Sequence, residues 1–134
     1  MKSGVEIKPA DPCPCGSAQP YSACCGRWHA GEAAPTAEAL MRSRYAAFVV
    51  CNEKYLLATW HSSTRPTSVP FDSKQKWLGL KIIDTKAIDA DAAEVEFIAR
   101  YLVGGGSAAR LQERSRFVKV EGRWFYVEGD AVSR

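Results

Sequence analysis

The sequence predicts an α+β protein in which a short cysteine-rich segment precedes two helices and a four-stranded antiparallel sheet. Four cysteines lie within thirteen residues near the start of the chain. The next stretch repeats its apolar residues with a helical period, and the remainder alternates apolar and polar residues as strands do. Because both helices precede the strands, the pattern contains no strand–helix–strand unit and does not favour a parallel nucleotide-binding sheet.

Residues 1–34 differ in composition from the rest of the chain. Val5 and Ile7 are their only aliphatic side chains larger than alanine, so this segment cannot bury a core of its own. We place a boundary near Pro35, which gives a metal-binding segment over 1–34 and an α+β domain over 35–134.

Two helices are predicted after the boundary. The first begins at Thr36, whose hydroxyl can cap the free N–H groups of the first turn, and runs to about Val50. Its polar residues, including Ser43 and Arg44, lie mostly outside an apolar stripe with three-four spacing. The stripe consists of Ala37, Leu40, Met41, Tyr45 and Phe48. Asn52 can cap a second helix from Glu53 to about His61.

Strands follow a proline-containing loop over 62–73. Leu78, Leu80 and Ile82 alternate with smaller or polar residues, and the apolar residues of 95–103 do the same. Two further strands, 109–120 and 123–128, are joined by a turn in the manner of a hairpin. We therefore expect two helices packed on one face of a twisted antiparallel sheet.

The four clustered cysteines are the strongest functional signal. Cys13, Cys15, Cys24 and Cys25 form a Cys-x-Cys pair and a Cys-Cys pair separated by eight residues. In a reducing cytosol, clustered cysteines are more often metal ligands than disulfides. Four soft thiolates in a tetrahedral array suit Zn²⁺ and leave no open position for a substrate. The sequence therefore predicts one structural Zn²⁺ ion, held by all four cysteines.

Residues around the cysteines fit this prediction. Gly16 and Gly26 follow the two pairs, where a chain folding tightly around an ion needs positive φ angles. Arg27 is close enough in sequence to offset the negative charge of the thiolates. We expect Tyr21 and Trp28 to pack the segment against the larger domain. The fifth cysteine, Cys51, is expected to be a small buried hydrophobic residue.

Three alternatives for the cysteine cluster stay open. Adjacent side chains tend to point apart, so His29 could replace Cys24 or Cys25 as a ligand. The thiols could form a redox pair, although such pairs more often have Cys-x-x-Cys spacing beside a βαβ unit. An iron–sulfur cluster is the third possibility.

The stretches 13–17 (CPCGS) and 20–26 (PYSACCG) resemble the SEC-C motif, a short zinc-binding element also found at the C-terminal tail of the preprotein translocase ATPase SecA. The last ligand pair of that tail is Cys-His, where this sequence has Cys24-Cys25. The SecA tail is associated with the SecB chaperone and with ribosomes. The resemblance therefore implies a protein partner or the ribosome.

Three further stretches, 27–31 (RWHAG), 39–45 (ALMRSRY) and 55–61 (YLLATWH), resemble the YchJ family. This resemblance covers nearly the whole chain. The family is of uncharacterised function, and its main domain resembles the nuclear-transport-factor-2-like (cystatin-like) fold, a curved sheet with helices closing a cone. The resemblance implies a SEC-C segment over 1–34 and this cone-shaped fold over 35–134.

Folds of this cone type often enclose an apolar pocket, and some members use a pocket carboxylate or histidine as a general base. The sequence offers His61, Asp72 and Glu113 as candidate bases and Tyr45, Trp60 and Tyr101 as candidate walls. A helix-end cap is the structural alternative for His61, and a solvated loop carboxylate is that for Asp72. We assign no catalytic residue from the sequence alone.

A basic stretch follows in the third strand. Arg110, Arg114, Arg116 and Lys119 could meet phosphates on RNA, but alternate basic residues on a strand usually form its solvated face. The net charge of +3 is also too small to indicate a nucleic-acid or membrane partner. The first residues lack the apolar run of a secretory signal, and no apolar run is long enough to span a bilayer. We therefore expect a cytoplasmic protein without direct nucleic-acid contact.

These observations lead to two functional hypotheses. The first is a non-enzymatic interaction protein whose N-terminal segment folds around Zn²⁺ to dock on a partner protein or the ribosome. The second is an enzyme or small-ligand-binding protein that uses the pocket of the cone-shaped domain, with the zinc serving only local structure.

Overall fold

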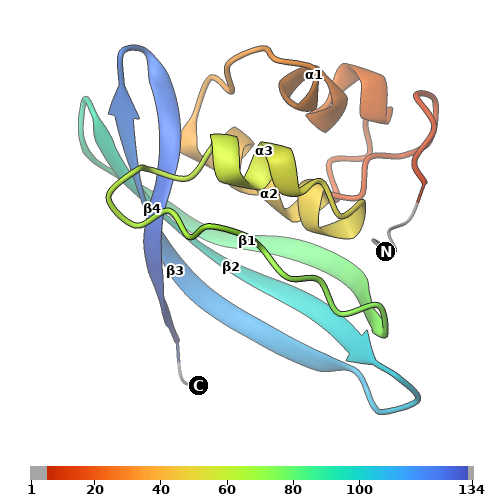
Figure 1. Ribbon diagram of the computed structural model, residues 1–134. Coiled ribbons are helices and arrows are strands. Elements are labelled where there is room, and N and C mark those ends of the chain that lie inside the picture. The colour runs from red at the N-terminus through yellow and green to blue at the C-terminus, as the bar shows by residue number, and fades with distance from the viewer. Residues whose placement is uncertain (1–5, 133–134) are drawn as a thin grey trace.

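The structure is a computed structural model that describes residues 6–132, so Val5 and the residues before it lie outside this range. Every helix of the described chain precedes every strand, which confirms the predicted α+β class (Figure 1). In chain order the elements are η1 (Tyr21–Ala23), α1 (Cys25–His29), α2 (Ala37–Val49), α3 (Glu53–Ala58), β1 (Gln75–Asp89), β2 (Ala92–Val103), β3 (Ala109–Val120) and β4 (Arg123–Ala131).

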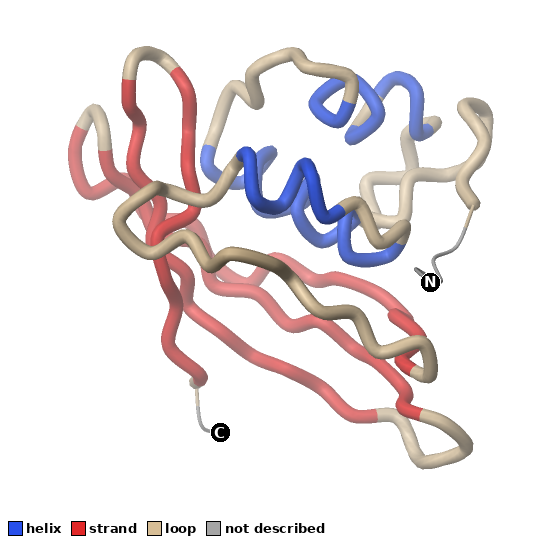
Figure 2. The backbone as a smooth tube through the Cα atoms, viewed as in Figure 1, coloured by secondary structure: helices blue, strands red, loops and turns tan. Residues whose placement is uncertain are grey.

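The four strands form one antiparallel sheet in the order β1-β2-β3-β4. The sheet curves, and helices α2 and α3 lie on its concave side (Figure 1 and Figure 2). Beyond these helices lies the cysteine segment, the part of the chain before α2 that carries the four clustered cysteines and includes η1 and α1. The turn between β3 and β4 has positive φ angles at Glu121 (51°) and Gly122 (81°), as a two-residue hairpin turn requires. The predicted meander of strands is confirmed.

The main core fills the space between α2 and the concave face of the sheet. Leu40 and Phe117 are almost completely buried there. The other buried members of this core are Ala34, Ala37, Met41, Tyr45, Val95, Phe97 and Ala99. Four of the five predicted stripe residues of α2 therefore face the sheet, and the fifth, Phe48, packs in a smaller cluster with Leu56 and Val69.

The predicted helix caps are confirmed, but the second helix is shorter than expected. Thr36 Oγ1 accepts a hydrogen bond from the Ala39 amide at 3.0 Å, and Asn52 Oδ1 accepts one from the Tyr55 amide at 3.0 Å. Helix α3 ends at Ala58 because the next residues pair with β4. The Tyr126 amide donates to the Thr59 carbonyl at 2.8 Å. No helix in the described residues has the length and hydrophobicity to cross a membrane.

Helix α2 is buried on more sides than its apolar stripe predicts. Ser43 and Arg44 lie outside the stripe, yet their exposed fractions are only 0% and 4%. Ser43 Oγ donates to the Leu40 carbonyl at 2.7 Å and lies 2.6 Å from the Tyr55 hydroxyl of α3. The helix is therefore enclosed by the sheet, by α3 and by the cysteine segment.

Strand β1 departs from the predicted alternation at Leu78. The register of β1 against β2 shifts between Trp77 and Gly79, so Leu78 is an extra residue in a β-bulge. The bulge leaves Leu78 42% exposed and brings Trp77 against the core in its place. Leu80 and Ile82 pack against the core, as the sequence predicts.

A pair of alanine substitutions tests this bulge. We expect Leu78→Ala to change the free energy of unfolding by less than about 0.5 kcal/mol, because an exposed side chain loses little burial. We expect Leu80→Ala to lower it by about 2 kcal/mol, because Leu80 contacts both the main core and the cysteine cluster. Chemical denaturation monitored by tryptophan fluorescence measures both, and equal losses would contradict the bulge.

Candidate functional site

The cysteine segment is folded by a short network of backbone hydrogen bonds. The Cys13 amide donates to the Gln19 carbonyl at 2.8 Å, and the Gly16 amide donates to the Cys13 carbonyl at 3.3 Å. Gly16 has the predicted positive φ angle, 85°. The positive φ angle predicted for Gly26 was wrong. Gly26 is not among the residues with positive φ, and it is needed because a Cβ there would lie 2.7 Å from the Tyr21 carbonyl oxygen.

This network brings the four predicted cysteines together. The sulfur atoms of Cys13, Cys15, Cys24 and Cys25 all lie within 4.8 Å of one another, and those of Cys15 and Cys24 are 3.6 Å apart. Tetrahedral Zn²⁺ with bonds of about 2.3 Å to sulfur places its sulfur ligands about 3.8 Å apart. Cys24 is partly exposed and the other three cysteines are buried. The four side chains are thus positioned to bind a metal ion.

The thiols of the cluster affect one another's ionisation. Hydrogen bonds from Cys13 and Cys25 lower the pKa of Cys15, and the interaction with Cys15 raises the pKa of Cys13 to about 11. The same contacts raise the pKa of Cys25. Cys15 therefore ionises before Cys13 and Cys25, and a bound divalent cation would displace the protons of those two thiols.

A positive side chain from α2 lies against the cysteine segment. Arg42 Nη1 donates to the Cys15 carbonyl at 2.8 Å, while Arg42 Nε donates to Glu38 at 3.0 Å. The predicted neighbour, Arg27, instead pairs with Glu32 at 3.1 Å. A guanidinium from α2 thus reaches across to the cysteine segment.

His29 is not directed at the cysteines. Its Nε2 lies 2.8 Å from the Ser43 carbonyl of α2, and its Nδ1 lies 2.5 Å from the Tyr21 hydroxyl. Because a carbonyl oxygen can only accept, Nε2 carries the proton and Nδ1 accepts from the tyrosine. Burial lowers the pKa of His29, which favours the neutral ring. Both ring nitrogens are thus occupied in joining the cysteine segment to α2.

Aromatic residues complete this junction, as the sequence predicts. Tyr21 and Trp28 both pack against the cluster formed by the buried cysteines and Ala46 of α2. Trp28 also contacts the main core. Helix α1, which carries Trp28, was not predicted, because its five residues are too few to show a helical repeat of apolar side chains.

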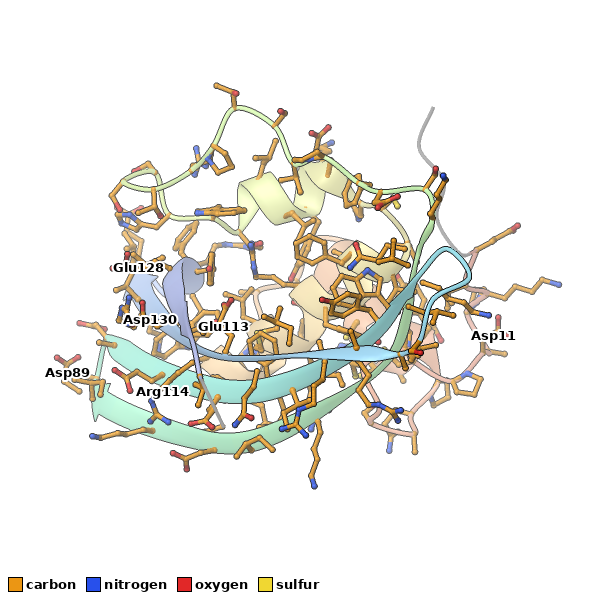
Figure 3. The ribbon with its side chains drawn as sticks, turned by 90° about the horizontal axis from the view of Figure 1, so that it is seen from below. Asp11, Asp89, Glu113, Arg114, Glu128 and Asp130 are labelled. Atoms are coloured by element: carbon orange, nitrogen blue, oxygen red, sulfur yellow. The ribbon has the colours of Figure 1, made fainter. Side chains whose placement is uncertain are left out.

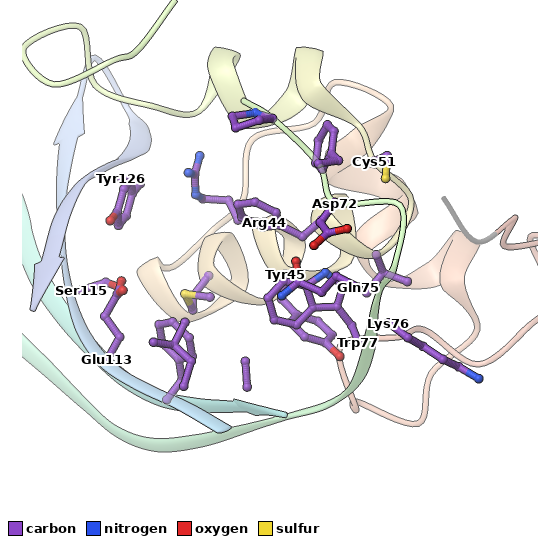
Figure 4. A pocket seen from close by; sticks show the side chains of 18 of the residues that line it. Arg44, Tyr45, Cys51, Asp72, Gln75, Lys76, Trp77, Glu113, Ser115 and Tyr126 are labelled. Atoms are coloured by element: carbon purple, nitrogen blue, oxygen red, sulfur yellow. The ribbon is translucent and has the colours of Figure 1, made fainter. Parts of the chain in front are cut away.

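The concave side of the sheet encloses a cavity of about 570 Å³ beneath α2 and the loop before β1 (Figure 4). It is lined by two of the candidate bases, Asp72 and Glu113, and by two of the candidate walls, Tyr45 and Trp60. The other two candidates lie elsewhere. His61 Nδ1 is 2.7 Å from the Ser63 hydroxyl, and the ring of Tyr101 packs against Trp77 with 5.7 Å between ring centroids.

Arg44 is a wall of this cavity that the sequence did not predict. Its Nη1 donates to the Leu56 carbonyl at 2.8 Å and to the Thr59 hydroxyl at 2.7 Å. The guanidinium also lies over the rings of Trp60 and Tyr126, at 5.0 Å and 4.5 Å. Burial lowers the pKa of Arg44 to about 10, so it keeps its charge at neutral pH. Helical periodicity alone cannot reveal a buried arginine outside an apolar stripe.

Two of the four basic residues of β3, Arg114 and Arg116, lie in ion pairs on the outer face of the sheet. Arg114 pairs with Glu94 at 2.6 Å and with Glu96 at 3.1 Å. Arg116 pairs with Asp130 at 2.9 Å. Glu113 and Arg114 are adjacent in the strand and point to opposite sides of the sheet (Figure 3). The acidic partners offset the charges of Arg114 and Arg116, whereas Arg110 donates to Gln112 and Lys119 lies over the ring of Trp124.

Two family models match the chain. Residues 10–27 match the SEC-C motif, and residues 36–129 match the family described as "YchJ, middle NTF2-like domain". A solution structure of a SEC-C motif containing protein from Rhodopseudomonas palustris is 36% identical, with a TM-score of 0.79, and the match covers 92% of this chain and all of that one. Fold and motif together define a SEC-C segment joined to a nuclear-transport-factor-2-like domain.

Relatives of similar length carry the name "UPF0225 protein". One from Xanthomonas campestris is 55% identical over 90% of this chain and 95% of its own length. One from Bordetella pertussis is 54% identical over 94% of this chain and 98% of its own. The chain belongs to the YchJ family, to which the sequence resemblance also points.

The hydrogen bonds of His29 give a test of the ligand set. We expect His29→Gln to bind as much metal as the unsubstituted protein, because both ring nitrogens already have partners outside the cluster. We expect Cys25→Ser to lose the metal. Elemental analysis after gel filtration measures both. Loss of metal in His29→Gln, with the fold retained by circular dichroism, would restore histidine as a ligand.

Proposed function

We propose that the four cysteines hold one structural Zn²⁺ ion. The observation that carries this proposal is the approach of four mostly buried sulfur atoms to within 4.8 Å of one another, in a segment with little apolar core of its own. Thiolates are soft ligands that suit zinc, and four of them fill its tetrahedral shell. The bound metal would supply folding free energy and hold η1 and α1 against α2.

Native mass spectrometry of protein purified without added metal or chelator tests the metal. We expect the mass of one zinc ion in the folded protein and its loss on denaturation. Cys13→Ser combined with Cys15→Ser should abolish zinc binding, whereas Cys51→Ser, at a cysteine outside the cluster, should leave it unchanged. A metal-free protein whose mass is two or four hydrogens low would indicate disulfides and overturn the proposal.

We further propose that the zinc-folded segment is a docking unit for a partner protein or the ribosome. The resemblance to the SecA tail supports this role. The exposed, uncharged residues in and around η1 also support it. We call this set the docking face, and it consists of Ala18, Gln19, Pro20, Ser22 and Ala23. Small uncharged side chains over a rigid metal-bound turn can enter an interface with little loss of conformational entropy.

A substitution on the docking face separates docking from metal binding. We expect Ala23→Arg to keep one zinc ion, because the side chain is exposed, and to weaken binding by at least about fivefold through a bulky charge at the interface. Purified ribosomes, by co-sedimentation, and purified SecB, by calorimetry, are the probes. Thr85→Arg, at an exposed position of β1, is the matched control. If the unsubstituted protein binds neither probe, docking is contradicted.

A second candidate function is the binding of a small molecule in the cavity beneath α2. A volume of about 570 Å³ with aromatic walls and a few polar groups is typical of ligand sites. Glu113, a candidate from the sequence, lines this cavity and supports the second hypothesis. Zinc would then serve to hold α2 in place above the ligand.

A further inference from the structure

One end of the cavity carries two opposite charges that do not pair with each other. Arg44 and Glu113 both line the cavity, and Figure 4 shows them on the same side as Tyr126 and Ser115. In the described chain, the guanidinium hydrogen bonds go to Leu56 and Thr59, and no ion pair links it to Glu113. Both charged groups line the same cavity, so one ligand bound there can contact each of them.

Each charge is held in place by its surroundings. Arg44 is 4% exposed, and both of its hydrogen bonds come from Nη1, so its Nε and Nη2 groups have no acceptor among the described residues. The Glu113 carboxylate accepts a hydrogen bond from Ser115 Oγ at 2.6 Å. A side chain at Gly129 would collide with this carboxylate, so the glycine leaves the space that Glu113 occupies. Both groups are fixed before any ligand arrives.

The rest of the cavity favours a ligand whose main part is flat and apolar. Tyr45 and Trp77 meet edge to face, with 5.7 Å between their ring centroids, and Phe97 and Phe48 add further aromatic surface. A volume of about 570 Å³ holds a molecule of one or two rings. Farther from Glu113, the carboxylate of Asp72 also lines the cavity, whereas the Lys76 side chain extends away from it (Figure 4).

The balance of charge selects the ligand's polar group. Besides Arg44 and Glu113, the lining at this end includes Tyr126, whose phenol is neutral because burial raises its pKa to about 12. Arg116 and Glu128, which also act on Tyr126, pair with each other at 3.3 Å. A carboxylate ligand would meet repulsion from Glu113, and an amine would meet repulsion from Arg44. A neutral group with both an acceptor and a donor would satisfy both residues with charge-assisted hydrogen bonds.

We infer that the cavity binds a neutral aromatic molecule bearing an amide-type group, whose carbonyl accepts from Arg44 and whose N–H donates to Glu113. This inference rests on the proposed small-molecule function and names the ligand class. It also assigns both residues as specificity determinants of the site.

Four probes that share one ring test the ligand class on the full-length, metal-loaded protein. They are phenylacetamide, phenylacetate, phenethylamine and ethylbenzene, titrated into ¹⁵N-labelled protein and followed by amide chemical shifts. We expect phenylacetamide to bind about tenfold more tightly than either charged probe, which corresponds to one charge-assisted hydrogen bond. The largest shifts should fall on α2 and on β3 around Glu113.

The variant Glu113→Gln tests the selectivity. It keeps the shape of the side chain and removes the charge, so phenylacetamide should bind more weakly and phenylacetate more tightly, closing the gap between them. Glu128→Gln, at a carboxylate that pairs with Arg116, is the matched control and should change neither affinity. A purely structural role for Glu113 would not shift the two affinities in opposite directions.

The probes also separate this inference from the function on which it rests. If ethylbenzene or phenylacetate binds at the cavity as tightly as phenylacetamide, the ligand class is wrong and the cavity function stands. If none of the four probes shifts the resonances of cavity residues, both proposals are overturned.

Discussion

Helix α2 packs against the cysteine segment on one side and against the concave sheet on another, and both candidate sites depend on this double contact. Arg42 reaches the Cys15 carbonyl, and the Ser43 carbonyl lies against His29. One residue later, Arg44 and Tyr45 line the cavity. A single turn of helix therefore supplies groups to two places in the molecule. Because its backbone is rigid, neither set of contacts can move far without the other.

The sequence predicted those parts of the structure that local chemistry determines. The caps at Thr36 and Asn52, the hairpin at Glu121-Gly122 and the change from helical to strand periodicity each depend on a few neighbouring residues. The grouping of the four cysteines could also be predicted, because their spacing is short.

Other features depend on contacts between distant residues, and no local pattern contains them. The bulge at Leu78 arises from the pairing of β1 with β2, so strict alternation placed the wrong residue inward. Arg44 is buried because Leu56, Thr59, Trp60 and Tyr126 enclose it. Likewise, only the packing of α1 on α2 shows that His29 holds two elements together rather than facing the cysteines.

The contact between His29 and α2 bears on how such a chain can have been assembled in evolution. A metal-binding segment that folds alone can be attached to many unrelated proteins, because its stability does not depend on contacts with a neighbouring surface. In this protein the cysteine segment contacts α2 through the hydrogen bond between His29 and the Ser43 carbonyl and through the buried side chain of Ala46. Trp28 contacts both the cysteine cluster and the main core. A substitution in the cysteine segment at this contact must remain compatible with α2, and the reverse also holds. The two parts of the chain are therefore constrained to diverge together.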